Sequence, residues 1–332
     1  MKGLKLKKAL IVLISAALLT LASCEGKKEE KEKKELFSVD FQENRTLRYA
    51  FTSSREIETR WPSGSSEEEE KGNVDKDFES VEITVAYTPI KVDLYGLTTI
   101  KATCESIRAL RRSGSNETKG DAVVHFGDKS YTFTVNPAGK IVDNSELYEL
   151  IQQAGKKAFR SNTKRGRIKE PDMIWDYITT QWFLWDSVSS IEKPADGVSI
   201  GQSWKSKLSI PTPMVMRQAR DVTYTLDEIT QSEKGRLAVI KSTFSRASSV
   251  PDGWPILYTG KFRMSGRFGF LMRYRIQELT GEGKEIFNID AGRIEEYNHN
   301  YKIKMKASLQ MGLSGGPQIR IKKRLTMKLL ED

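Results

Sequence analysis

Alternation of apolar and polar residues with a period of two runs through most of this chain and constrains its fold more than any other feature. The apolar members are Leu47, Tyr49 and Phe51, then Val81, Ile83 and Val85, then Tyr131, Phe133 and Val135, then Val222, Tyr224 and Leu226, and then Tyr301, Ile303 and Met305. Successive side chains of a strand point to opposite faces, so this pattern predicts half-buried antiparallel strands. We therefore expect a mainly β (α+β) fold of curved antiparallel sheets.

Two short segments echo each other and suggest a division of the chain. Residues 133–141 and 287–294 each end a strand at Asn or Asp, turn at Ala-Gly and restart at a basic residue followed by Ile. The glycines, Gly139 and Gly292, supply the positive φ that a tight hairpin turn needs. Hairpins in general share such turns, and a duplication would also produce them. We expect two similar β-rich halves, residues 37–143 and 198–332.

Residues 144–197, between the halves, form the expected helical segment. After a cap at Asp143 and Glu146, a first helix places Leu147, Ile151, Ala154 and Ala158 on one face. Pro171 opens a second helix, in which Ile174, Ile178, Trp182 and Trp185 form a stripe. Both helices are expected to pack on a sheet face.

The second helix is rich in aromatic residues, and Trp175, Trp182 and Trp185 are the candidates for lining a ligand site. Aromatic residues that surround a lipid or a sugar would show this pattern. A helix that fills a curved sheet would show it too, and aromatic residues at helical spacing more often belong to a core than to a ligand site.

The N-terminus carries four lysines, an apolar run from Ala9 to Leu21 and the tetrapeptide Leu21-Ala22-Ser23-Cys24. This segment resembles the signal of bacterial lipoproteins, and its apolar run is short for a membrane span. The resemblance implies that residues 1–23 are removed and that Cys24 is lipidated, which anchors the protein in a membrane of the cell envelope, periplasmic or outer in a Gram-negative host. Residues 24–36, almost wholly Lys and Glu, are expected to form a solvated tether.

The body offers a weaker resemblance. Residues 198–204, with the sequence Val-Ser-Ile-Gly-Gln-Ser-Trp, are similar to a strand entry in tandem-β lipoproteins of unknown function. A charged tether and antiparallel strands with a helix over one face also resemble the lipoprotein-localisation carriers, whose incomplete barrels hold acyl chains. This likeness concerns architecture and assigns a role to no residue.

Charge is unevenly distributed. Residues 25–197 carry 27 basic and 31 acidic side chains, whereas residues 198–332 carry 23 basic and 13 acidic ones. On an exported, anchored protein, a basic face points to anionic lipid, lipopolysaccharide or acidic wall polymer as partners, and not to nucleic acid. If the last two strands pair as a hairpin, one surface gathers the candidate anion-binding residues Lys302, Lys304, Lys306, Arg320, Lys322 and Arg324, with Lys328 beside them. A plain solvated sheet face is the alternative.

Catalytic signals are weak. The two histidines, His125 and His299, have no neighbours at metal-ligand spacing, and Cys104 lies in a strand-like stretch typical of a small buried residue. Asp172 and Asp176 can share a helix face, as carboxylates do on any acidic helix. We therefore predict no catalytic residues, no metal and no cofactor.

Together these features predict a lipid-anchored envelope lipoprotein with a non-catalytic binding or structural role. A carrier of lipid or another hydrophobic ligand in a half-barrel cavity is the alternative. An envelope hydrolase is the third possibility.

Overall fold

A computed structural model describes residues 33–62, 73–119, 122–158, 167–169, 172–210, 212, 218–250, 263–265, 271–309 and 316–330. The chain divides into two compact units, Met1–Lys33 and Lys34–Asp332, and the description below concerns the second. In the described ranges, no helix combines the length and the apolar character needed to cross a bilayer.

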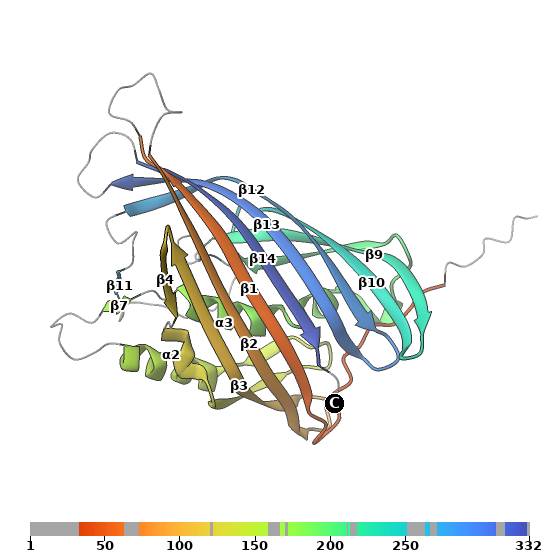
Figure 1. Ribbon diagram of the computed structural model, residues 1–332. Coiled ribbons are helices and arrows are strands. Elements are labelled where there is room, and N and C mark those ends of the chain that lie inside the picture. The colour runs from red at the N-terminus through yellow and green to blue at the C-terminus, as the bar shows by residue number, and fades with distance from the viewer. Residues whose placement is uncertain are drawn as a thin grey trace, which may run out of the picture. The chain divides into compact units, whose positions relative to one another are not determined.

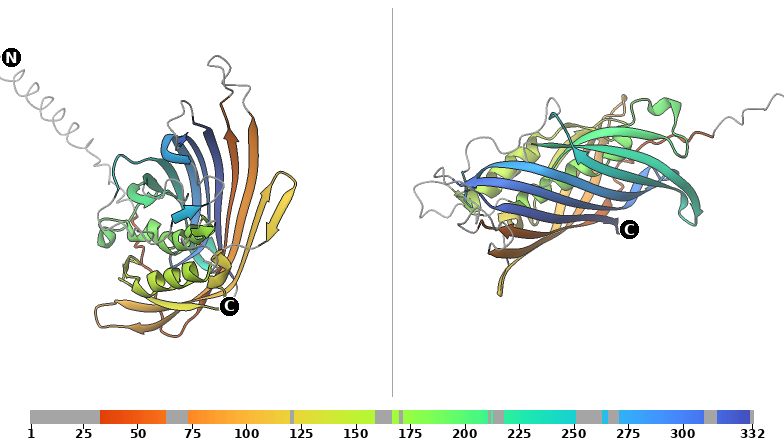
Figure 2. Two further views of the ribbon diagram at one scale, coloured as in Figure 1. Left: turned by 90° about the vertical axis from the view of Figure 1, so that its left-hand side faces the viewer. Right: turned by 90° about the horizontal axis from the view of Figure 1, so that it is seen from above.

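One large, twisted antiparallel sheet of 12 strands dominates this unit (Figures 1 and 2). Its order is β6-β5-β3-β2-β1-β14-β13-β12-β10-β9-β8, and β4 pairs with β3. The first six strands are β1 (Leu47–Arg60), β2 (Val74–Val92), β3 (Thr98–Ser113), β4 (Asn116–Lys119), β5 (Ser130–Val135) and β6 (Ile141–Asp143). The others are β8 (Ser203–Ser209), β9 (Ala219–Ser232), β10 (Gly235–Arg246), β12 (Leu271–Asn288), β13 (Arg293–Leu309) and β14 (Gln318–Leu329), while β7 (Arg167–Lys169) and β11 (Arg263–Ser265) pair separately.

β1, near the start of the described unit, pairs with β14, near its end. This antiparallel ladder runs from Tyr49 opposite Leu329 to Arg60 opposite Gln318. The prediction of a mainly β, antiparallel, curved architecture is confirmed, with these strands joined in a single sheet. The β1–β14 seam brings together residues more than 250 positions apart.

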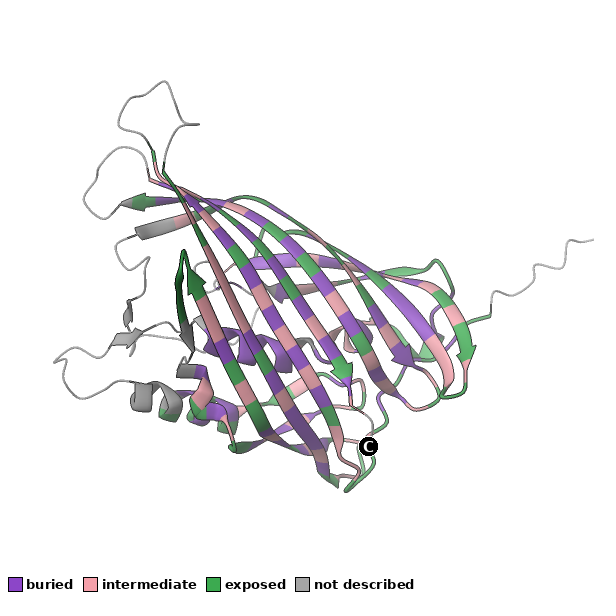
Figure 3. Ribbon diagram, in the orientation of Figure 1, coloured by how far each residue is buried: buried purple, intermediate pink, exposed green. Residues whose placement is uncertain are grey.

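The predicted alternation matches the burial of the strands. Figure 3 shows buried residues alternating with half-buried or exposed ones along β1, β13 and β14. Tyr49 and Phe51 on β1 and Ile303 and Met305 on β13 are buried, as expected. The buried face lies against the helices and the exposed face turns to solvent, so one sheet face forms the core.

The helices lie on the inner face of the sheet (Figure 2). They are η1 (Ala122–Phe126), α2 (Ser145–Ala158), α3 (Asp172–Phe183), α4 (Asp186–Ser189) and η2 (Pro194–Asp196). The predicted second helix was too long, because α3 ends at Phe183 and Trp185 stands at the start of α4. Residues 173–181 of α3 are buried on every side, so this helix is enclosed and has no solvent-facing stripe.

The two echoing segments are both hairpin turns. Gly139 and Gly292 have φ values of 83° and 58°, the left-handed conformation that favours glycine. A Cβ at Gly139 would lie 2.8 Å from Trp185 Cβ, and one at Gly292 would lie 2.6 Å from Asp40 N. Both turns therefore need glycine for space as well as for φ.

The start of the folded unit corrects the extent of the tether. Glu35, expected to be solvated, is buried, forms a β-bridge with Val198 and accepts a hydrogen bond from Arg236 at 2.6 Å. Glu35 therefore belongs to the folded body, although it lies within the predicted tether of residues 24–36.

Candidate functional site

The outer face of β13 and β14 carries a concentration of positive charge. The register places Lys302 opposite Lys322 and Lys304 opposite Arg320, while Arg324 lies opposite Asn300. Of the six predicted anion-binding residues, Lys304 is half-buried and the others are exposed. We call Lys302, Lys304, Lys306, Arg320, Lys322, Arg324 and Lys328 the basic face.

Carboxylates border the basic face on both sides. On β1, Glu58 lies 3.6 Å from Arg320 and Glu56 lies 3.7 Å from Lys322. On β12, Glu278 is opposite Lys304 and Glu282 is opposite Asn300. Ion pairs this exposed contribute little to stability. Because these carboxylates lie on the neighbouring strands β1 and β12, the positive charge remains concentrated on β13 and β14.

Five cations of the basic face have no ion pair within the described part of the chain: Lys302, Lys304, Lys306, Arg324 and Lys328. Like charges directly opposite in a ladder are destabilising, as at Lys302 and Lys322. An anionic partner would relieve this repulsion.

The same face is hollowed by a groove of about 660 Å³, within the range of small-ligand sites. Lys302, Lys322 and Arg324 line it together with the carboxylates of Glu56 and Glu282. Its neutral lining includes Ser54, Phe78, Thr243, Thr280 and Asn300. The groove therefore offers charged and hydrogen-bonding groups, and it crosses the β1–β14 seam.

Beneath the seam lies a buried ionic cluster that the sequence analysis missed. Asp176 of α3 accepts hydrogen bonds from Ser53 and Arg55, both at 3.0 Å, and forms an ion pair with Lys323. Burial lowers the pKa of Lys323 to about 8, against the opposing effect of Asp176. Burial works to raise the pKa of Glu79, but Arg55 and Arg111 outweigh it and hold that pKa below its usual value. The cluster ties α3 to β1 and β14.

A second polar cluster surrounds α4. Asp186 accepts hydrogen bonds from Tyr224 at 2.7 Å and Ser206 at 3.0 Å, and Ser187 donates to Glu285. Burial raises the pKa values of Asp186 and Glu285, the latter to about 8. Close by, the Arg220 guanidinium carbon lies 4.8 Å and 4.4 Å from the ring centres of Phe244 and Tyr301.

Each cluster holds a serine hydroxyl that donates to a carboxylate, but Ser53 and Ser187 are both buried and neither pair includes a histidine. Burial and Arg220 lower the pKa of His299 to about 3, so this imidazole is neutral at physiological pH, and its Nδ1 lies 3.4 Å from the Tyr301 hydroxyl. His125 is exposed on η1. Within the described ranges, no group of His, Cys, Asp or Glu side chains is arranged to hold a metal ion.

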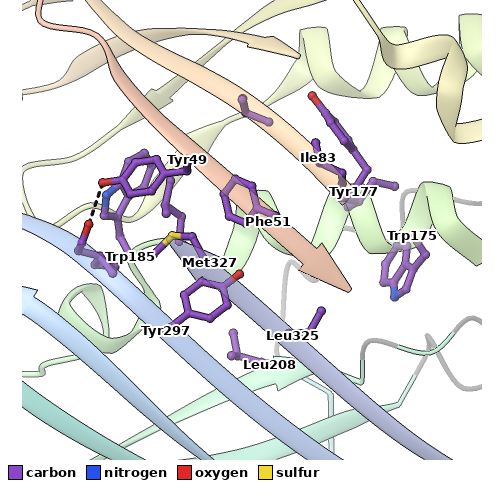
Figure 4. Packing of buried hydrophobic residues seen from close by; sticks show 14 of the residues in the cluster. Tyr49, Phe51, Ile83, Trp175, Tyr177, Trp185, Leu208, Tyr297, Leu325 and Met327 are labelled. Carbon is purple, nitrogen blue, oxygen red and sulfur yellow. Dashed lines mark hydrogen bonds between the residues drawn. The ribbon is translucent and has the colours of Figure 1, made fainter. Parts of the chain in front are cut away.

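The three candidate tryptophans take part in the core. Trp175 and Trp185 are buried, and Trp182 is half-buried against the core. Trp185 packs against Phe41, Tyr87 and Phe133, with ring centres 5.4, 6.1 and 6.0 Å apart. Figure 4 shows Trp175 set apart from Trp185 along the buried surface, so they do not line one common site. The cavity beside Trp185 encloses about 20 Å³, room for about one water molecule.

Cys24 and the predicted signal of residues 1–23 lie outside the described residues, as does the side chain of Asp172. Cys104 is fully buried, and burial raises the pKa of its thiol to about 12. It is therefore an unreactive core residue, as the strand pattern indicated.

No protein-family model matches this chain, and no curated protein sequence does. Among solved structures, the chain is similar to lipovitellin, from a study of its lipid–protein interactions, with 9% identity and a TM-score of 0.46 over 88% of this chain and 26% of that one. It is also similar to a Bacteroides fragilis protein described as exported and having a YmcC-like fold, with 9% identity and a TM-score of 0.22 over 89% and 97% of the two chains. An outer membrane channel from Pseudomonas putida gives 8% identity and a TM-score of 0.24 over 92% and 100%.

Proposed function

We propose that this protein is a lipid-anchored lipoprotein of the cell envelope whose basic face binds anionic lipid headgroups. The observation that carries the binding role is the pairing of β13 with β14, with five cations that have no ion pair among the described residues. The lipobox ending at Cys24 supports the anchoring role. The role is non-catalytic, in keeping with a neutral, buried His299 and a buried Cys104.

The basic face suits a surface of phosphate groups. Each cation near an anionic membrane contributes on the order of 1 kcal/mol, and several acting together give measurable adsorption. Lysines form point contacts that tolerate varied headgroup positions, while Arg324 can bind a phosphate with two hydrogen bonds. The groove beside them holds hydroxyl and amide groups that can contact the polar parts of a headgroup.

Vesicle co-sedimentation tests the binding role. The mature chain with Cys24→Ala, which lacks the lipid, is compared on anionic phosphatidylglycerol vesicles and on neutral phosphatidylcholine vesicles. At low salt we expect binding to the anionic vesicles only. Changing Lys302, Lys304 and Lys306 to Gln removes about 3 kcal/mol of attraction and should weaken this binding by about 100-fold.

A matched control distinguishes binding by the basic face from a general effect of the protein's net charge. Lys101, Lys129 and Lys193 are exposed lysines outside the basic face, and changing all three to Gln alters the net charge equally. This variant should bind nearly as well as the parent. Equal loss in both triple variants, or binding to neutral vesicles that the basic-face substitutions leave intact, contradicts the assignment. Competition by soluble lipopolysaccharide or an acidic polymer, with no vesicle binding, would assign the face to those anions instead.

The carrier alternative gains no support from the tryptophans. The 20 Å³ cavity beside Trp185 is far too small for an acyl chain, and Trp175 lies elsewhere in the core. The larger groove is on the outer face, lined mainly by polar and charged residues.

A further inference from the structure

The hairpin between β2 and β3 ends in an exposed apolar tip. Leu94 is 101% exposed and the adjacent Tyr95 is 85% exposed. Ile90 and Leu97, on either side of them, are 45% and 37% exposed. Single exposed apolar residues are common on protein surfaces, but here three lie on one turn and the fourth, Ile90, is near the end of the strand that enters it, a grouping typical of an interaction site. We call these four residues the apolar tip.

The turn that carries the apolar tip is tightly built. Asp93 Oδ1 accepts hydrogen bonds from the backbone N–H groups of Tyr95 and Leu97, both at 2.8 Å. Gly96 has a φ of 77°, and a Cβ there would lie 2.7 Å from Pro137 Cγ, so the turn rests against the β5–β6 turn. The only carboxylate of the turn thus faces its own backbone, while Leu94 and Tyr95 project outward.

The tip is at the same end of the sheet as the start of the folded unit. From Glu35 to Asn44 the chain crosses these strand ends: Asp40 N donates to Gly292 O at 2.9 Å, and Asn44 N donates to Pro89 O at 2.8 Å. Val92 N, one residue before Asp93, donates to Glu43 at 2.8 Å. Residues 24–33 span at most about 33 Å when fully extended. An acylated Cys24 therefore holds this end of the sheet close to a bilayer.

We propose that the apolar tip inserts into the interfacial region of the bilayer that holds the lipid anchor. Leu94 supplies apolar area to be buried, and Tyr95 is of the type enriched at membrane interfaces, with an apolar ring and a polar hydroxyl. The anchor raises the local concentration of the tip, so a contact of two side chains suffices to orient the body. This second membrane contact goes beyond the proposed function, because it depends on apolar burial and not on charge.

A fluorescent probe at the tip tests this directly on the acylated protein. Because Cys104 is buried, Leu94→Cys provides the accessible thiol for a polarity-sensitive fluorophore once Cys24 is acylated. In neutral phosphatidylcholine vesicles, we expect a blue-shifted emission and quenching by lipids brominated on their acyl chains. The matched control is Val74→Cys, which labels an exposed apolar position at the opposite end of β2 from the tip and should keep a solvent-like emission.

A second measurement does not need the anchor. The unacylated Cys24→Ala chain should partition into concentrated neutral vesicles, and Leu94→Ser with Tyr95→Ser should lower the partition coefficient by about tenfold or more. Val74→Ser should leave it unchanged, and raising the salt should have little effect. A solvent-like probe at residue 94 on protein whose acylation is verified by mass, together with equal partitioning of parent and tip variant, overturns the proposal. Absence of the acyl mass would instead count against the anchoring role.

Discussion

Removing the charge of Asp176 should destabilise the fold more than any other single charge change in the described structure. Asp176 is buried on α3. It accepts hydrogen bonds from Ser53 and Arg55 of β1 and forms an ion pair with Lys323 of β14. With Asp176→Asn, the cations Arg55 and Lys323 lose the carboxylate that they share, while Glu79 stays nearby. Removing one partner of a buried ion pair costs about 3–5 kcal/mol, because the remaining charge stays buried.

The assay is urea unfolding of the mature Cys24→Ala chain, followed by tryptophan fluorescence at pH 7. We expect Asp176→Asn to lower the free energy of unfolding by about 3–5 kcal/mol. The double variant Asp176→Leu with Lys323→Met removes both charges and should recover at least half of this loss. A single variant within about 1 kcal/mol of the parent would refute the reasoning, as would a double variant that is the less stable of the two.

Two further predictions concern pH and a turn. Burial raises the folded-state pKa of Glu285 to about 8, so between pH 6.5 and 8 the folded protein holds a proton that the unfolded chain has released. The free energy of unfolding should therefore fall over this range by on the order of 1–2 kcal/mol. His299, whose pKa is lowered to about 3, changes stability only below this range, and Glu285→Gln should remove the decline in urea titrations. Gly292→Ala should destabilise by about 2–4 kcal/mol through contact with Asp40, whereas Gly114→Ala, at similar φ with no atom within 4 Å, should lose only about 1 kcal/mol; equal losses in thermal unfolding would show that φ alone matters.

Much of the strand arrangement could be predicted because alternation acts locally. Tyr49, Phe51, Ile303 and Met305 point inward as their period of two requires. The β1–β14 seam could not be predicted in the same way, because pairing of residues so distant in sequence depends on tertiary packing. The seam nonetheless matches charges, with Glu56 and Glu58 of the acidic half beside Lys322 and Arg320 of the basic half.

Two buried charges, Arg55 and Lys323, could have been recognised from the alternation of the strands. Arg55 occupies an inward position between Ser53 and Ile57, and Lys323 occupies one between Ile321 and Leu325. A charge at an inward position signals a buried partner. The partner, Asp176, lies on a helix whose face could not be assigned from the stripe, because α3 is enclosed on all sides.

The apolar tip was not found from sequence because Leu94 and Tyr95 continue an apolar-rich stretch and look like strand residues. Only the turn at Asp93 and Gly96, with its two hydrogen bonds to one carboxylate oxygen, takes them out of the ladder. The basic face, in contrast, follows from spacing alone once the two strands pair.

The mass of the mature N-terminal peptide, from protein expressed with its signal and isolated from membranes, tests the central claim most directly. We expect a chain that begins at Cys24 and carries acyl groups, and a Cys24→Ala variant that is folded and recovered in the soluble fraction. An unmodified Cys24, or a chain that retains residues 1–23, would contradict lipid anchoring.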